Sequence, residues 1–172
     1  MKITLIAYPD EKRWLETKQR ALVTVWKTTE KPPSFDWKKG ILKARHSPIR
    51  HLEFSFYMEG IPSYISAHLA RHVHAQPYIS SQRNDRQDKY DREAARQDAP
   101  VNMIYDINAE ELMTIANKRL CFLASPKTRE VVRIMCDEVL KVCPEFEGLL
   151  VPACQYNKVC HEMYPCNRNK DG

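Results

Sequence analysis

Alternating apolar and polar residues predict β-strands at two places in the chain. Residues 2–7 (KITLIA) alternate in this way and predict a first strand. Residues 51–58 alternate more strictly, and one face of that strand carries only the apolar side chains of Leu52, Phe54, Phe56 and Met58. Gly60 and Pro62 follow and are expected to end the second strand. Both strands therefore turn one face toward a core.

Apolar residues that recur three and four positions apart predict helices in the rest of the chain. The pattern places these helices at 9–26, 39–45, 64–74, 109–122 and 126–142. Ser63 is the predicted N-cap of the third helix, and Asp106 or Asn108 that of the fourth. Two prolines within residues 28–40 predict a loop there.

The charged segment 83–98 has nearly balanced acids and bases, which predicts a solvated helix held by ion pairs. Together the elements predict one α+β domain over residues 1–172, with three or four helices around a small, mainly antiparallel sheet. A cysteine-rich tail occupies about residues 150–172.

Composition narrows the class of protein. The chain has 172 residues, of which 43% are apolar and 28% charged, an ordinary globular composition. Its apolar runs stay well short of the roughly 18–20 residues that a membrane-spanning helix needs. The N-terminal MKITLIAY leads directly into charged residues, so it lacks the apolar core and cleavage site of a secretory signal. We therefore expect a cytoplasmic protein with no membrane association.

Glycine is scarce, with four residues in the chain. Both the P-loop and the G-x-G-x-x-G turn need several glycines for close backbone approach to phosphate, so both are excluded. Any phosphate must be held by side chains and helix ends. The net charge is 27 − 22 = +5, a mild excess that suits a small anionic ligand or a weak attraction to nucleic acid and does not distinguish them. We expect a nucleotide and not nucleic acid as the partner.

Histidine and arginine concentrate in one part of the chain. Five of the six histidines lie between residues 46 and 74, at His46, His51, His68, His72 and His74. His68 and His72 have the i, i+4 spacing of a helical zinc site, but the H-E-x-x-H pattern is absent. Because Arg71 joins them on the predicted helix, we favour an anion site, in which guanidinium groups offer paired donors to phosphate.

Several motifs in this region resemble those of the flavin-dependent thymidylate synthases. Arg71-His72-Val73, followed after seven residues by Ser81 and then by Arg83, resembles their R-H-R-x7-S signature. The segment 46–51 (HSPIRH) is similar to their H-x-T/S-P-F-E-H element, and the segments 105–109 (YDINA) and 117–119 (NKR) are similar to their later helix with a substrate arginine. The similarity runs in order over about residues 44–145.

The resemblance implies a thymidylate-synthase-complementing-type fold, with a small antiparallel sheet packed against helices. It also implies FAD-dependent methylation of dUMP to dTMP, with methylenetetrahydrofolate as the carbon donor and NADPH as the reductant. Enzymes of this family are homotetramers whose sites combine residues from several subunits.

The resemblance also assigns site residues. Carried over position by position, the substrate-binding residues are His68, Arg71, Ser81, Arg83 and Arg119. The cofactor-binding residues are Ser47, Arg71, His72, His74 and Asn108. The candidate catalytic residues are Arg119, which would stabilise charge on the uracil ring, and Ser81, which acts as a ligand and not as a nucleophile.

The chain departs from the family pattern at five positions. Val73 replaces the second arginine of the signature, and the others are Tyr78, Ile79, Asn84 and Asn102. These departures leave two alternatives open. One is a relative that modifies another pyrimidine nucleotide, and the other is a catalytically silent homologue that binds nucleotide or nucleic acid.

The tail contains a second group of metal-binding residue types, Cys154, Cys160, His161 and Cys166. Thiolates with an adjacent imidazole can bind zinc or an iron–sulfur cluster, but the spacing is not the tight C-x2-C of a zinc knuckle. We therefore predict no metal here and keep the four residues as candidates. Cys121, Cys136 and Cys143 follow helical patterns and are expected in the core.

Overall fold

The computed structural model describes residues 1–83, 85, 91 and 93–166. Along the chain the elements are β1 (Lys2–Ala7), α1 (Glu11–Val23), α2 (Phe35–Lys43), the 3-10 helix η1 (Ser47–His51), β2 (Glu53–Pro62), α3 (Ser63–Ala70), β3 (Ala75–Ile79), β4 (Pro100–Asn108), α4 (Ala109–Arg119), α5 (Pro126–Val142), the 3-10 helix η2 (Pro144–Phe146) and α6 (Ala153–Asn157).

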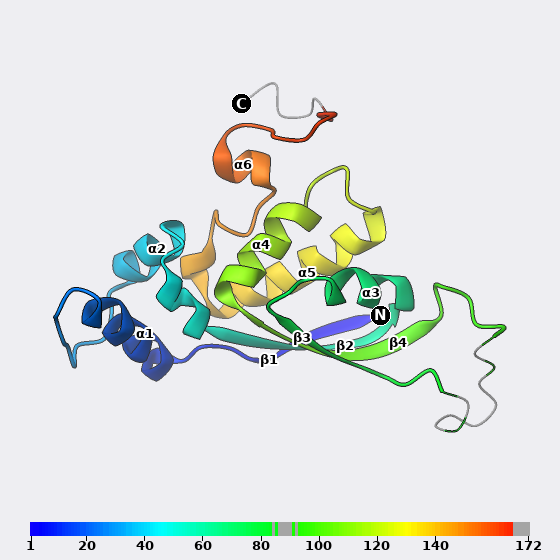
Figure 1. Ribbon diagram of the computed structural model, residues 1–172, viewed down its shortest axis with the longest axis horizontal. Coiled ribbons are helices and arrows are strands. Elements are labelled where there is room, and N and C mark those ends of the chain that lie inside the picture. The colour runs from blue at the N-terminus through cyan, green and yellow to red at the C-terminus, as the bar shows by residue number, and fades with distance from the viewer. Residues whose placement is uncertain (84, 86–90, 92, 167–172) are drawn as a thin grey trace.

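The four strands form one antiparallel sheet in the order β1-β2-β4-β3. Helices α3, α4 and α5 lie on the same side of this sheet (Figure 1). In β2 the side chains of Phe54, Phe56 and Met58 are buried beneath these helices, while Tyr57 on the opposite face is exposed. Alternation along a strand therefore produces one covered face and one open face.

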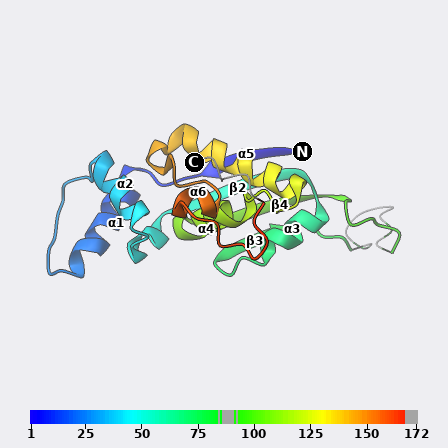
Figure 2. The same cartoon turned by 90° about the horizontal axis from the view of Figure 1, so that it is seen from above.

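The core between sheet and helices is built from aromatic and aliphatic side chains. Phe56 pairs across strands with Tyr105, and both are fully buried. Phe54 meets Phe146 of η2 edge to face, with ring centroids 5.5 Å apart. Helices α1 and α2 pack at one end of the molecule, beyond the ends of strands β1 and β2 (Figure 2).

The structure confirms the predicted α+β class and the strand at 2–7. The helices predicted at 109–122 and 126–142 are α4 and α5. Asn108, one of the two predicted caps, is the N-cap of α4, and its side chain accepts a hydrogen bond from the backbone N–H of Glu111 at 2.9 Å. The described residues contain six α-helices, of which α6 had no predicted counterpart.

The predicted helix 9–26 is too long, and the predicted loop 28–40 is wrong in its second half. Helix α1 ends at Val23, and Trp26 adopts a left-handed φ of 59°. Helix α2 begins at Phe35 because Ser34 caps it, accepting a hydrogen bond from the backbone N–H of Trp37 at 3.2 Å. The sequence analysis missed this helix start because the capping serine directly follows two prolines, which predicted a loop.

The predicted helix 64–74 stops at Ala70, and Ser63 is not its N-cap. Pro62 occupies the cap position, while the Ser63 hydroxyl donates to the carbonyl of Gln97 at 2.7 Å. Arg71 ends the helix as its C-cap, and the chain then turns into β3. Pairing of β3 with β4 outweighs the local helical pattern after Ala70.

Two strands were missed, and the second predicted strand was misplaced at both ends. β3 and β4 were not predicted, because β3 contains Pro77 and β4 begins with a proline. Pro77 is tolerated because β3 is an edge strand. β2 runs past Gly60, whose φ of 65° accommodates a register shift, and ends at Pro62.

The helix predicted for 83–98 is absent from the residues of this segment that are described, which lie in turns and irregular backbone. The two ion pairs found there, Arg83–Asp85 and Arg96–Asp98, join residues two positions apart. The rest of the segment, with Asn84, lies outside the described residues. A search of the described helices for one long and apolar enough to cross a membrane found none.

Candidate functional site

Four side chains gather where α3 and α4 end, and we call this group the arginine–histidine cluster: His68, Arg71, His72 and Arg119. Arg119 Nε donates to His72 Nε2 at 3.3 Å, and a terminal nitrogen of Arg119 donates to the backbone carbonyl of His68 at 3.4 Å. Arg71 is exposed and contributes to the positive potential at His68. The fold thus brings together His72 and Arg119, which lie 47 positions apart in the sequence.

The buried carboxylate of Glu111 is hydrogen-bonded to His72 of the cluster. Glu111 Oε1 lies 2.8 Å from His72 Nδ1, and both side chains are less than a tenth exposed. Burial lowers the pKa of His72, an effect that the hydrogen bond to Glu111 opposes and the Arg119 charge reinforces. The neutral imidazole therefore donates from Nδ1 to Glu111 and accepts from Arg119 at Nε2.

His68 faces a second, more open environment. Its Nδ1 lies 3.2 Å from the Thr128 hydroxyl of α5. Burial lowers its pKa, and the charges of Arg119 and Arg71 lower it further. His68 and Arg71 also line a pocket of about 590 Å³ together with Ser80 and Gln82, which follow β3. Its volume falls in the range of small-molecule sites.

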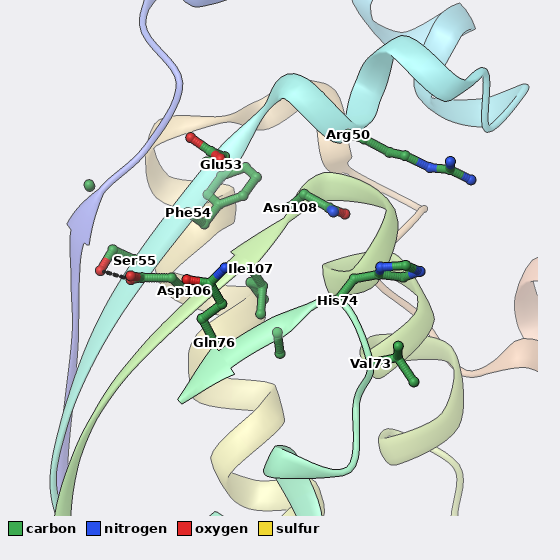
Figure 3. A pocket seen from close by; sticks show the side chains of 12 residues that line it. Arg50, Glu53, Phe54, Ser55, Val73, His74, Gln76, Asp106, Ile107 and Asn108 are labelled. Atoms are coloured by element: carbon green, nitrogen blue, oxygen red, sulfur yellow. Dashed lines mark hydrogen bonds between the residues drawn. The ribbon is translucent and has the colours of Figure 1, made fainter. Parts of the chain in front are cut away.

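A second pocket, of about 540 Å³, lies where β2 starts, β4 ends and β3 starts. Figure 3 shows Arg50, Asn108 and His74 along one side of it, and Ser55 hydrogen-bonded to Asp106 on the other. Arg50 is ion-paired with Glu110 of α4, a contact that raises the pKa of the guanidinium. This polar pocket, rich in hydrogen-bond donors, is here called the strand-end pocket.

The structure brings together only some of the residues predicted to bind substrate and cofactor. His74 and Asn108 line the strand-end pocket, and Val73 lines it too. Ser47 is exposed at the start of η1 and is not among the residues that line that pocket.

Ser81 and Arg83 lie in the segment after β3. The Ser81 hydroxyl accepts a hydrogen bond from the backbone N–H of Arg83 at 3.2 Å, and Arg83 pairs with Asp85. The neighbours of Ser81, and not Ser81 itself, line the pocket that contains Arg71.

The departures from the family pattern are mostly on the surface. Val73 is 87% exposed and Tyr78 is 58% exposed. The side chain of Asn102 accepts a hydrogen bond from the backbone N–H of Gly60 at 3.0 Å, so it supports the irregular stretch of β2. An arginine at this position could not accept that hydrogen bond.

Sequence reasoning missed Glu111. A signal was present, because this acid stands among the apolar residues of α4 that point into the core. A buried carboxylate needs a partner. The partner, His72, comes from a turn that the sequence pattern assigned to a helix, so the pairing was not visible before folding.

Of the three cysteines that precede the tail, two are buried in the core and one is only partly buried. Cys136 and Cys143 are buried as predicted, and burial raises the pKa of each thiol to about 12. The prediction that Cys121 is a core residue is wrong, because it follows the end of α4 and is only partly buried. In the described part of the chain, no three histidine, cysteine or acidic side chains are placed to hold a metal ion.

The fold is that of the flavin-dependent thymidylate synthases, the family that the sequence motifs resemble. A crystal structure of thymidylate synthase X from Helicobacter pylori with FAD and dUMP matches 87% of this chain and 99% of its own, with a TM-score of 0.69 at 14% identity. A second structure of that enzyme with FAD and dUMP matches 86% of this chain and 98% of its own, with a TM-score of 0.67 at 16% identity.

A UMP/dUMP methylase from Streptomyces cacaoi, bound with 5-Br dUMP, has the same fold. It matches 84% of this chain and 92% of its own, with a TM-score of 0.66 at 12% identity. No family profile and no curated protein sequence matches the chain. At these identities the comparisons establish the fold, which confirms the prediction made from the sequence motifs.

Proposed function

We propose that the protein is a flavin-dependent methylase that converts dUMP to dTMP, with methylenetetrahydrofolate as carbon donor, FAD as hydride carrier and NADPH as reductant. Support comes from the shared fold and from neighbours crystallised with FAD and dUMP or a dUMP analogue. The observation that carries the proposal is the arginine–histidine cluster, in which Arg119 meets two histidines at the end of α3.

Arg119 suits the role of the group that stabilises negative charge on a pyrimidine. A guanidinium has five N–H donors, and contacts to His72 and His68 use Nε and one terminal nitrogen. The remaining donors can bind the uracil carbonyl, where charge develops when the ring is attacked. Because His72 is held neutral, it accepts from Arg119 without adding a second positive charge.

Arg71 and His68 suit the phosphate and sugar end of the nucleotide. Arg71 is exposed beside His68 on the same pocket and offers paired donors to a phosphate dianion. Ser81 and Arg83 would complete this end, contributed through the assembly of several chains. None of these roles requires a covalent nucleophile on the protein.

The donor set of the strand-end pocket fits a flavin. His74, Asn108 and Arg50 present ring, amide and guanidinium N–H groups, which match the carbonyls and phosphates of FAD. Ser47 and Arg71 would add contacts from outside this pocket. When bound, FAD supplies the hydride transfer, and the chain's own residues orient the nucleotide beside it.

We further propose that the active form is a homotetramer. The open face of the sheet carries Tyr57, Ile104 and Tyr78 in one cross-strand row, with exposed fractions of 36%, 38% and 58%. Apolar side chains grouped on an exposed sheet face are typical of a surface that another chain covers. A second copy there would also bring residues of two chains toward one site.

A direct assay tests the proposed reaction. The purified protein is incubated with methylenetetrahydrofolate, FAD and NADPH and with dUMP, UMP or dCMP in parallel, and the nucleotides are analysed by mass spectrometry. We expect dUMP to gain one methyl group. Methylation of UMP or dCMP instead would identify a relative with another pyrimidine substrate. A colourless protein that does not bind added FAD and is not stabilised by dUMP would support the silent homologue.

A further inference from the structure

Four of the six cysteines line one pocket beyond the C-terminal end of α4, next to the first turns of α5. They come from two parts of the chain: Cys121 follows α4, while Cys154, Cys160 and Cys166 lie in and after α6. The pocket has a volume of about 320 Å³. We call this group the four-cysteine pocket.

In the later part of the tail, the cysteines are partly buried and the large apolar side chains are exposed. Among residues 157–166, all of which are described, Cys160 and Cys166 alone are partly buried, and the other eight are exposed. Met163 and Tyr164 are 84% and 80% exposed. Hydrophobic burial would turn these two large side chains inward. The tail instead turns its thiols toward the body of the protein.

The start of the tail is attached to the body by specific contacts. The Tyr156 hydroxyl donates to the carbonyl of Lys43 at 2.9 Å, and the Arg45 guanidinium lies 5.0 Å from the centre of the Tyr156 ring. Asn117 of α4 donates to the carbonyl of Val151 at 2.7 Å. These contacts hold α6 beside Cys121, so the segment that carries Cys160 and Cys166 starts next to its potential partner.

We propose that the four-cysteine pocket is a structural metal site, in which the thiolates of Cys121, Cys154, Cys160 and Cys166 bind one Zn²⁺ ion. Four sulfur ligands are the usual complement of a structural zinc centre, and soft thiolates favour zinc over hard cations. Each thiol releases its proton on binding, so the ion with four thiolates carries a charge of −2. Arg129 and Arg133 line the same pocket and offset that charge.

The site is not preassembled, because no three metal-binding side chains of the described residues already surround a common point. The ion therefore has to draw the exposed segment 157–166 inward. This movement costs little, since that segment has no fully buried side chain to displace. Its effect reaches α4, because Cys121 follows Arg119 by two residues. A bound ion would hold the chain immediately beyond the arginine–histidine cluster.

The test measures metal binding by the full chain, purified with a thiol reductant and without a metal-binding tag. After incubation with Zn²⁺ and desalting, we expect about one zinc ion per chain. Co²⁺ in its place should give the thiolate charge-transfer band and the visible bands of a tetrahedral site. Cys121→Ser and Cys166→Ser should each retain less than about a tenth of that zinc. His161→Asn is the matched control, because His161 lies in the tail but not on the pocket, and it should bind zinc as the parent does.

A second measurement needs no variant. Zinc should slow alkylation of Cys121, Cys154, Cys160 and Cys166 in the parent protein, as mapped by mass spectrometry, while Cys136 reacts slowly with or without it. Four results would overturn the proposal: no zinc retained, zinc retained equally by Cys121→Ser, zinc lost in His161→Asn, or a disulfide between Cys121 and the tail as the stable form under reductant.

Discussion

At the scale of single residues, Glu111 determines which nitrogen of His72 carries the proton. Its carboxylate accepts a hydrogen bond from the Nδ1–H group, which leaves Nε2 free to accept from Arg119. A carboxylate that orients an imidazole is a common arrangement in enzyme sites. Here the oriented imidazole of His72 in turn positions the guanidinium of Arg119. Glu111 is therefore a positioning residue for Arg119.

Glu111→Gln should weaken dUMP binding by about tenfold and lower the free energy of unfolding by ~1–2 kcal/mol, because a neutral amide replaces a charge-assisted hydrogen bond. Titration with dUMP and urea unfolding measure the two effects. Glu130→Gln on the surface of α5 is the control and should change neither. If stability falls while dUMP affinity stays at the parent value, Glu111 is merely structural.

The buried His72 and the partly buried His68 predict a pH-dependent stability. Burial holds the pKa of His72 and His68 below the ordinary value of 6.5 in the folded chain. Below pH 6.5 the unfolded chain binds protons at these residues more readily than the folded chain does, so the free energy of unfolding decreases as the pH is lowered. The slope is at most ~1.4 kcal/mol per pH unit for each histidine. Urea unfolding between neutral and mildly acidic pH measures it.

His72→Asn removes one of these groups and should flatten the pH dependence, while the exposed His161→Asn should leave it unchanged. A parent protein whose free energy of unfolding stays constant over this pH interval would mean that neither imidazole is held neutral by burial.

At the scale of elements, α4 connects the strand-end pocket with the arginine–histidine cluster. Its N-cap, Asn108, lines the strand-end pocket, and its last residue, Arg119, belongs to the arginine–histidine cluster. The helix follows β4 without a loop, so the sheet fixes both its position and its start. Asn108 caps the helix, and under the proposed function it also binds FAD, so the two roles can be tested separately.

Substitutions of Asn108 separate these functions. Asn108→Ala should lower the free energy of unfolding by ~1 kcal/mol, because the cap is lost. Asn108→Asp keeps the cap oxygen at a helix N-terminus and should remain as stable as the parent. Both variants lack the amide donor, so we expect both to retain less FAD. Chemical unfolding and flavin absorbance measure these effects, and full FAD retention by Asn108→Asp would exclude the amide from the flavin site.

At the scale of the whole molecule, the helices cover one face of the sheet and leave the other open (Figure 1). The row of Tyr57, Ile104 and Tyr78 lies on that open face. Pairing of two such faces would bury aromatic rings that water now contacts. The oligomeric state of the protein should therefore depend on this row.

Ile104→Lys should dissociate the proposed tetramer without unfolding the chain, because its charge would be buried between two copies. Val142→Lys is the matched control, since Val142 is 41% exposed, close to the 38% of Ile104, and lies on α5. Analytical ultracentrifugation measures the assembly, and circular dichroism measures the helix content. Equal assembly of both variants would show that this face is not an interface.

Local patterns predicted the elements that have strong local signals. The alternation around Phe54 and Phe56 identified β2, and Asn108 before an amphipathic run identified α4. β3 escaped prediction because its five residues contain an alanine, a glutamine and a proline, and its extended form depends on pairing with β4. The helix predicted up to residue 74 failed for the same reason.

The motifs around Arg71, Ser81 and Arg119, together with the predicted α+β class, were sufficient to identify the fold, because the order and types of these residues are properties of the chain alone. The sequence also showed where basic donors concentrate. Tertiary structure decided which of them meet. The Glu111–His72–Arg119 chain and the four-cysteine pocket each join segments more than 30 positions apart, and such contacts form only when packing of the core positions their elements.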